Sequence, residues 1–357
     1  TAAAAAAALA RGLALLNSLT ARAEVDLAAS TADPDGAARR GYACASLRCA
    51  RGLVADLDWR AAGEEGGQGG GALASAAAAS LARLLNAAHG ALSLTEDSLA
   101  APHAAFAGAE DVVEGGGVAF GEAEGDEKAV VASSTPGAAG AASAAGRSLL
   151  RLSAAWRTMT EGLALFETVV VAVPTPGDEE EEEEGGAGGG NTSPALTLLL
   201  PPAALVAMGG ALTRVLVRVK HVGALDTARS ALAALGARLL TDTTKAPVGG
   251  SLEQPSSTPR PQRAWPDAWR AAWTAAATSP GGGLDDLVRR SGGLPFFMVA
   301  LMQAGAAVGG GHAAGSALVR ACLADVMGLL GETPAGAAPC APVDAYAPRV
   351  HGFNTLR

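Results

Sequence analysis

Two adjacent arginines in a short glycine-rich stretch are the residues of this chain best suited to bind a charged ligand. The stretch reads Arg289-Arg290-Ser291-Gly292-Gly293-Leu294-Pro295. Guanidinium groups form forked hydrogen bonds with phosphate, and the free backbone N–H groups of a turn add further donors. The pattern therefore predicts an anion-binding corner between two helices, with Arg289, Arg290 and Ser291 at its centre.

The same stretch also has a purely structural explanation. Residues 284–288 have helical spacing, so the two arginines fall in the last turn of a helix, where cations complement the helix dipole. Gly292 or Gly293 can take the left-handed conformation that closes a helix, and Pro295 suits the first turn of the next. Ser291 can bond a free helix end. A well-capped helix–turn–helix is therefore the alternative interpretation.

Regularly spaced apolar residues predict the helices that would carry this turn. The clearest series repeats every three or four residues and comprises Leu149, Leu152, Trp156, Met159, Leu163, Phe166 and Val170. Comparable patterns predict helices over about 1–30, 44–59, 72–89, 202–219, 225–239, 265–273 and 313–330, with a turn at 33–36. Strand-like alternation is nearly absent. The predicted fold class is therefore all-α, an α-solenoid with long disordered loops.

Low-complexity segments predict how the chain is divided. Residues 107–146 are rich in glycine, alanine, serine and acid, and we expect a disordered linker there. It separates a helical region, 1–106, from a helical-repeat core, 147–357. Further disordered insertions are expected at about 175–194 and 242–263. Because the chain begins with Thr1 and ends within an apparent helix, we expect it to be a fragment of a longer protein.

The net charge of −9 hides a basic region toward the C-terminus. Residues 204–357 contain 14 Lys and Arg against 9 Asp and Glu, whereas residues 1–203 contain 12 against 26. Two predicted loops hold 14 of those upstream carboxylates, seven in 110–127 and seven in 178–184. A mildly basic folded body is compatible with a nucleic-acid partner.

Motifs for enzymatic chemistry are missing from the sequence. It contains no phosphate loop, no nucleophile elbow, and no histidine or cysteine spacing typical of a metal site. The four cysteines indicate reduced, intracellular thiols, and the lack of a long uncharged stretch of large apolar residues predicts no membrane span. Trp265, Trp269 and Trp273 lie on one helical stripe, which favours core packing over base stacking.

Four stretches resemble the THADA family in the order in which that family has them. The first is the arginine stretch followed by phenylalanine. The others are Trp156-Arg157-Thr158-Met159-Thr160-Glu161, Lys220-His221-Val222-Gly223-Ala224-Leu225-Asp226 and Val350-His351-Gly352-Phe353-Asn354-Thr355-Leu356-Arg357. Thr160 departs from the family, which usually has lysine there. The resemblance covers roughly residues 147–357 and implies armadillo- or HEAT-like helical repeats.

The resemblance also implies a function. Fungal members of the family are partners of an FtsJ-type 2′-O-ribose methyltransferase that acts on the tRNA anticodon loop. A cytoplasmic, non-catalytic scaffold without a cofactor of its own is therefore expected, with tRNA and the methyltransferase as partners. Arg289 and Arg290 are the first candidates for contacts, followed by Lys220, His221 and Arg157. If helix junctions lie together on one edge, these residues form one basic ridge.

Two other classes of function remain open. Animal relatives have been linked to calcium handling and to death-receptor signalling, so a protein-binding scaffold unrelated to RNA is the first alternative. An enzyme active without a partner is the second. Salt-dependent binding of tRNA favours the scaffold for methylation, whereas methyl transfer by the protein alone would establish the enzyme.

Overall fold

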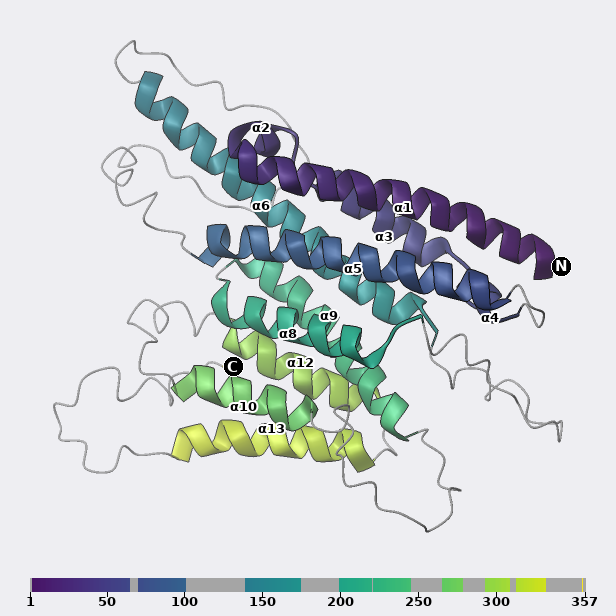
Figure 1. Ribbon diagram of the computed structural model, residues 1–357. Helices are drawn as coiled ribbons and strands as arrows, with labels where there is room; N and C mark the ends of the chain where they lie inside the picture. The colour runs from purple at the N-terminus through teal and green to yellow at the C-terminus, as the bar shows by residue number, and fades with distance from the viewer. Residues whose placement is uncertain are drawn as a thin grey trace.

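The computed structural model describes residues 2–64, 70–100, 139–174, 199–219, 221–244, 265–278, 293–308 and 313–331, together with Thr355. Within these ranges every regular element is a helix, which confirms the predicted fold class (Figure 1). The helices are α1 (Ala2–Ala32), α2 (Pro34–Arg39), α3 (Cys44–Asp56), α4 (Ala61–Glu64), α5 (Gly70–Ala100), α6 (Ala139–Ala172), α8 (Pro202–Arg218), α9 (Val222–Thr244), α10 (Trp265–Thr278), α12 (Leu294–Ala307) and α13 (Ala313–Gly331).

The helices are arranged in two layers (Figure 1). In the first layer α1, α5, α8, α10 and α13 follow one another, and in the second layer α3, α6, α9 and α12 do the same. Each second-layer helix also packs against a first-layer helix, as α6 does against α5 and α9 against α8. Stacked helix pairs of this kind are typical of an α-solenoid.

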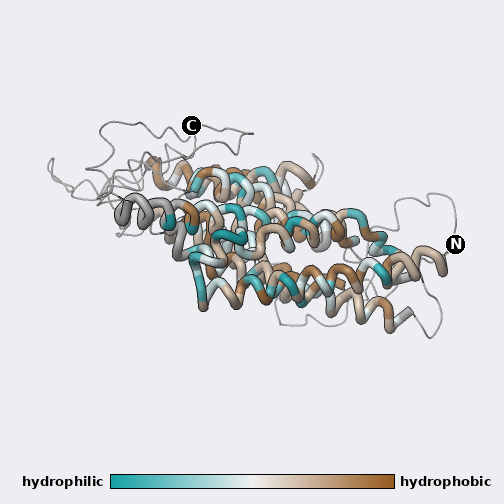
Figure 2. The backbone as a smooth tube through the Cα atoms, turned by 90° about the horizontal axis from the view of Figure 1, so that it is seen from above, coloured by the Kyte–Doolittle hydropathy of each residue, from teal (hydrophilic) through white to brown (hydrophobic). Residues whose placement is uncertain are grey.

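The predicted apolar stripes form the core between the layers. Met159, Leu163 and Phe166 of α6 are fully buried, and the stripe of α8 from Leu205 to Val219 is buried along its whole length. Hydrophobic and hydrophilic residues alternate along each helix in Figure 2, as expected for amphipathic helices. At about 25 cal/mol for each Å² of apolar surface removed from water, this burial is the main force that holds the pairs together.

The tryptophan stripe of α10 belongs to this core, which confirms the packing interpretation. Trp265, Trp269 and Trp273 are all buried. The first two rings lie 4.4 Å apart between centroids. Trp273 donates a hydrogen bond from Nε1 to the carbonyl oxygen of Leu294, 2.9 Å away at the start of α12. None of the three rings is therefore free to stack on a base.

Several helix boundaries differ from the predictions. The expected turn at 33–36 is instead the start of α2, because Asp33 accepts a hydrogen bond from the backbone N–H of Gly36 and Pro34 fits the first helical position. Helix α5 continues beyond residue 89 to Ala100, and α6 begins at Ala139, inside the segment predicted to be a linker. Helix α9 continues to Thr244, into the insertion predicted at 242–263. The rest of that insertion, 245–263, the insertion predicted at 175–194 and the rest of the predicted linker, 107–138, lie outside the described residues.

Arginines fasten neighbouring pairs to each other. Arg238 of α9 donates hydrogen bonds to the carbonyl oxygens of Val170 and Val173, both at 2.7 Å, where α6 ends. These carbonyls have no partner within the helix, so a cation from α9 satisfies them. Arg270 of α10 binds both carboxylate oxygens of Asp325 in α13, at 2.6 and 2.8 Å.

Two helices are long and apolar enough to cross a membrane by length and composition alone, Ala2–Ala32 and Ala313–Leu330. Both pack into the array through leucine-bearing faces that include Leu13, Leu16 and Leu318. Of the described cysteines, Cys44, Cys49 and Cys322 are free thiols.

Candidate functional site

A line of contacts joins the turns before α3, α9 and α12 to the middle of α6, and we call it the junction edge. It comprises residues 39–44 before α3, 156–158 in α6, Val219 and 221–223 at the start of α9, and 293–294 at the start of α12. The hydroxyl of Thr158 donates to the carbonyl oxygen of Gly41 at 3.4 Å, which links the first two of these segments. The first of these segments is a helix junction, and the second lies in the middle of α6.

Two of the family-like stretches meet at the junction edge. The ring of Trp156 from α6 lies against the ring of His221 at the start of α9, with 4.8 Å between centroids and 32° between planes. Gly223 lies under both rings, because a Cβ at that position would be 3.2 Å from Nε1 of Trp156 and 3.4 Å from Cε1 of His221. The glycine therefore allows the two stretches to pack closely.

This contact leaves two polar atoms unused. Nε1 of Trp156 and Nδ1 of His221 are buried without a hydrogen-bond partner among the described residues. Such atoms are uncommon in folded proteins, and each is a place where a further polar group would be stabilised. Burial also lowers the pKa of His221, so its ring is neutral at neutral pH. His221 therefore contributes a stacked ring to the junction edge and no positive charge.

A third family-like stretch reaches the same place through Gly293, the N-cap residue of α12. Its φ is −89°, so of the two glycines that could take the left-handed conformation this one does not, and Gly292 lies outside the described residues. The reason for glycine is close packing: a Cβ would lie 1.9 Å from the carbonyl oxygen of Leu216 and 2.7 Å from Cδ2 of Leu225. Pro295 follows in the first turn of α12, as predicted.

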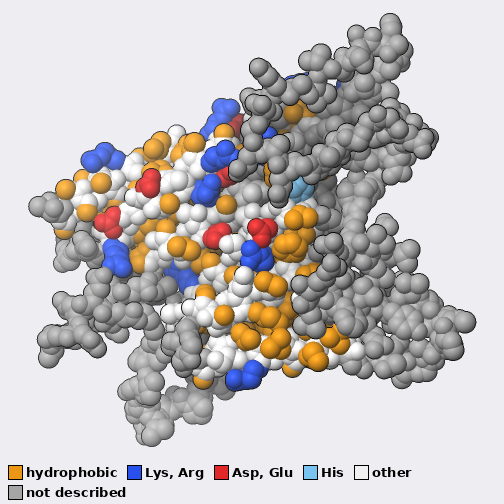
Figure 3. Space-filling view, turned by 180° about the vertical axis from the view of Figure 1, so that it is seen from behind, with side chains coloured by type: hydrophobic (Ala, Val, Ile, Leu, Met, Phe, Trp, Pro, Cys, Tyr) orange, Lys and Arg blue, Asp and Glu red, His pale blue; other side chains and the backbone are white. Residues whose placement is uncertain are grey.

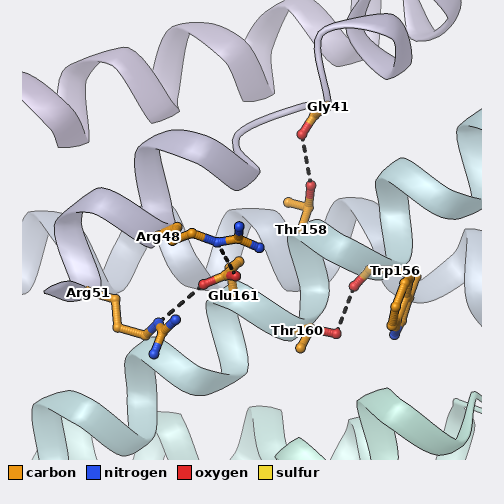
Figure 4. Close-up of polar contacts among 7 residues, drawn as sticks. All are labelled: Gly41, Arg48, Arg51, Trp156, Thr158, Thr160 and Glu161. Atoms are coloured by element: carbon orange, nitrogen blue, oxygen red, sulfur yellow. Dashed lines mark hydrogen bonds and ion pairs between the residues drawn. The ribbon is translucent and has the colours of Figure 1, made fainter. Parts of the chain in front are cut away.

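Glu161, the last residue of the tryptophan-containing stretch, joins α6 to α3 (Figure 4). Its Oε1 accepts from Nε of Arg48 at 2.7 Å, and its Oε2 accepts from Nε of Arg51 at 3.2 Å. The carboxylate is buried, with 8 % of its side chain exposed, and the hydrogen bond raises the pKa of Arg48. A buried carboxylate between two guanidinium groups is well compensated for its loss of water.

A second buried glutamate repeats this arrangement one pair further on. Glu96 of α5 forms ion pairs with Arg218 at 2.8 Å and Arg214 at 3.9 Å, both from α8. Figure 3 shows the second-layer face, where Lys and Arg side chains gather in the upper part with acidic side chains between them. Basic side chains on the array are therefore partly used to join helices and partly left at the surface.

The predicted site residues are only partly described. Arg157 is exposed on α6, one residue after Trp156, and forms no hydrogen bond or ion pair with a described residue. His221 is half-buried against Trp156. Lys220, Arg289, Arg290 and Ser291 lie outside the described residues, as does almost all of the stretch at 350–357. In the sequence, Lys220 directly precedes His221, and Ser291 is two residues before Gly293.

The sequence did not reveal the partners of Glu161. Arg48 and Arg51 have the three-residue spacing that places two side chains on one helical face, but nothing in the sequence connects them with a residue about 110 positions later. Among the described residues, no three His, Cys, Asp or Glu side chains lie together in a way that could hold a metal ion.

Glu161→Gln should lower the free energy of unfolding by about 1 kcal/mol, because the amide keeps the shape but loses both charge-assisted bonds. The effect is modest because Arg48 and Arg51 remain in contact with water, 62 % and 38 % exposed. Urea unfolding at low and high salt measures it, and the loss should shrink at high salt. Glu24→Gln, which removes the more exposed pair with Arg83, is the control and should have a smaller effect. Equal losses in the two variants would contradict the prediction.

Comparisons with known proteins identify the family. A family model described as THADA/TRM732, DUF2428 matches residues 80–357. The match begins well before residue 147, where the family-like motifs begin, and therefore includes most of α5. Comparison with curated proteins and with solved structures found no match. Because the matched range covers more than three quarters of the chain, the chain belongs to the THADA/TRM732 family.

Proposed function

We propose that the protein is a non-catalytic helical scaffold that holds tRNA beside a 2′-O-ribose methyltransferase of the FtsJ type. In this proposal the partner binds S-adenosylmethionine and carries out methyl transfer in the anticodon loop, in the cytoplasm. The scaffold acts by positioning, since holding two reactants in the right orientation removes much of the entropic cost of their encounter. No cofactor is needed on the scaffold itself.

The observation that carries the proposal is the convergence of three family-like stretches on the junction edge. Trp156 stacks on His221, and Gly293 packs on the end of α8 beside Leu225. Stretches separated by about 65 residues in the sequence therefore meet in space. Basic residues accompany all three stretches: Arg157 is exposed next to Trp156, Lys220 directly precedes His221 in the sequence, and Arg290 is three residues before Gly293. Cations of this kind suit a phosphate backbone.

The unused atoms of Trp156 and His221 support a binding role for the same edge. An indole N–H is a donor only, and a neutral imidazole offers either a donor or an acceptor at Nδ1. Both atoms are buried next to Gly223. A bound phosphate or ribose group, or a carbonyl from the partner protein, would supply what they lack. A contact that served only to pack the two rings against Gly223 would not need polar atoms without hydrogen-bond partners.

The test is to map ribose methylation of tRNA in cells that carry Arg289→Ala/Arg290→Ala. We expect methylation to fall about tenfold or more while the protein level stays normal, because each lost charge-assisted contact weakens binding about tenfold. Arg289→Lys/Arg290→Lys, which keeps the charges, should retain part of the activity. Arg11→Ala/Arg60→Ala removes two exposed arginines elsewhere on the array and should have no effect.

Four other outcomes would contradict the proposal in different ways. Unchanged methylation at a normal protein level would remove the role of the arginine pair. Loss of soluble protein would favour the helix-capping interpretation of the stretch. If the purified protein transfers methyl groups to tRNA without a partner, the protein is an enzyme and not a scaffold. If the purified protein fails to bind tRNA even at low salt, the result favours a scaffold that binds only proteins.

A further inference from the structure

A second arginine pair lies at the other end of the junction edge, in the part of the chain before the family domain. Arg39 is the last residue of α2, and Arg40 is its C-cap. Both are exposed, and neither side chain forms a hydrogen bond or an ion pair with a described residue. The matched family domain begins at residue 80, so these arginines lie outside it.

The backbone holds this pair in a defined place. The N–H of Gly41 binds the carbonyl oxygen of Ala38 and the N–H of Tyr42 binds that of Ala37, both at 2.9 Å. This is the Schellman arrangement, and it places Gly41 at φ 76° and Tyr42 at φ 47°. A non-glycine residue with positive φ is uncommon and costs about 1–2 kcal/mol, so the surrounding packing must hold this turn.

The simplest explanation of the two arginines is that they cap α2. Cations near a helix C-terminus do complement its dipole. In α2, however, the carbonyl oxygens of Ala37 and Ala38 already accept from the backbone of Gly41 and Tyr42. The helix therefore closes its own end, and both guanidinium groups remain available to a ligand.

The surroundings of the pair are basic. Asp35, in the first turn of α2, is already hydrogen-bonded to Arg151 of α6 at 2.6 Å, with Arg147 at 4.0 Å. The pKa of Asp35 is lowered mainly by that bond to Arg151, with smaller contributions from Arg147 and Arg39. The carboxylate of Asp35 thus interacts with several arginines at once. Arg40 and Arg157, on either side of the link between Gly41 and Thr158, have no acidic partner among the described residues.

The position of the pair matches that of the basic residues already proposed as contacts. Arg39-Arg40 come just before α3, Lys220-His221 just before α9, and Arg289-Arg290 shortly before α12. Neighbouring helices pack at about 8–10 Å, so the three steps from α3 to α12 span about 24–30 Å. A span on this scale covers several phosphates along a nucleic-acid backbone.

We infer that Arg39, Arg40 and Arg157 form a further phosphate-binding site, for the backbone of an RNA that lies along the junction edge. The inference rests on the proposed function and extends the RNA-binding surface upstream of the family domain. The ligand is the phosphodiester backbone, so the site contributes affinity without sequence preference. Arg157 links this site to the tryptophan-containing stretch of α6.

The experiment measures binding of an unmodified tRNA transcript to the purified protein over a range of salt concentrations. Arg39→Gln/Arg40→Gln should weaken binding about tenfold per arginine at low salt. It should also reduce the slope of log K against log salt by about 1.4–1.8, because two phosphate contacts are lost. Arg39→Lys/Arg40→Lys should keep the slope close to that of the wild type.

Two controls separate this inference from the proposed function. Arg11→Gln/Arg60→Gln removes the same charge from exposed positions away from the junction edge and should leave the slope unchanged. Circular dichroism and thermal unfolding establish that each variant is folded. If Arg39→Gln/Arg40→Gln binds tRNA with the wild-type slope while Arg289→Ala/Arg290→Ala loses binding, the upstream site is wrong and the proposed function stands. If the wild-type protein shows no salt-dependent binding of tRNA, the proposed function fails first.

Discussion

Replacement of Gly293 by alanine is expected to lower the free energy of unfolding by about 3 kcal/mol. The new Cβ would lie 1.9 Å from the carbonyl oxygen and 2.8 Å from the carbonyl carbon of Leu216. Both are backbone atoms of α8, so no side chain can rotate away, and the start of α12 must move off the helix beneath it. Overpacking of this kind typically costs about 1–3 kcal/mol, and the upper end applies where backbone must shift.

Gly52→Ala is the matched control for this substitution. Gly52 lies in α3 on an exposed face, and a Cβ there would meet nothing within 4 Å. The same change should therefore stabilise the protein by about 0.5–1 kcal/mol, because alanine has the higher helix propensity. Urea unfolding followed by circular dichroism measures both variants. Equal stabilities for Gly293→Ala and the wild type would show that α12 does not pack on α8 as described.

Trp273→Ala should cost about 3–5 kcal/mol, the range found for removal of a buried aromatic side chain. Trp273 is completely buried, so the substitution leaves a cavity beneath α12. It also leaves the carbonyl oxygen of Leu294 without its donor, since Nε1 of Trp273 is 2.9 Å away. Thermal unfolding should show a lower midpoint, and tRNA binding should fall in parallel because Leu294 follows Gly293 on the junction edge.

Two further variants separate the causes of the stability lost in Trp273→Ala. Trp273→Phe retains most of the apolar volume but removes the donor, so it should cost about 1–3 kcal/mol, the penalty for an unsatisfied buried acceptor. Val222→Ala, at a residue that is 66 % exposed, should change stability little. A Trp273→Ala variant as stable as Val222→Ala would contradict the packing of α10 against α12.

The sequence was sufficient to predict the helices and the faces they bury. The stripe on α6 and the paired prolines before α8 are local signals, and the spacing of large apolar residues at three and four positions directly determines which face turns inward. The tryptophans of α10 follow the same logic. The resemblance to the family was likewise readable from short stretches, and the family match at residues 80–357 confirms it.

Some features were not predictable, and most of these depend on distant residues. The residues Asp33-Pro34 signal a turn and a helix start equally well, and only the hydrogen bond to Gly36 decides between them. The pattern offered Gly292 or Gly293 for the left-handed conformation, whereas the role of Gly293 depends on a carbonyl of α8 that no local pattern reveals. The two arginines around Glu161 come from a helix far upstream. The partners of Arg289 and Arg290 lie outside the described residues and remain predictions.

The central position of α5 and α6 determines the order in which the array should lose its structure. In a stack of pairs, an inner pair is held from both sides, whereas an outer pair is held from one. Helix α13 rests mainly on α12 and exposes Leu323 and Met327, whereas α6 packs against α3, α5 and α9. Partial opening should therefore begin at the ends, as fraying does. The contact between Trp156 and His221 would then persist in molecules whose outer helices have already opened.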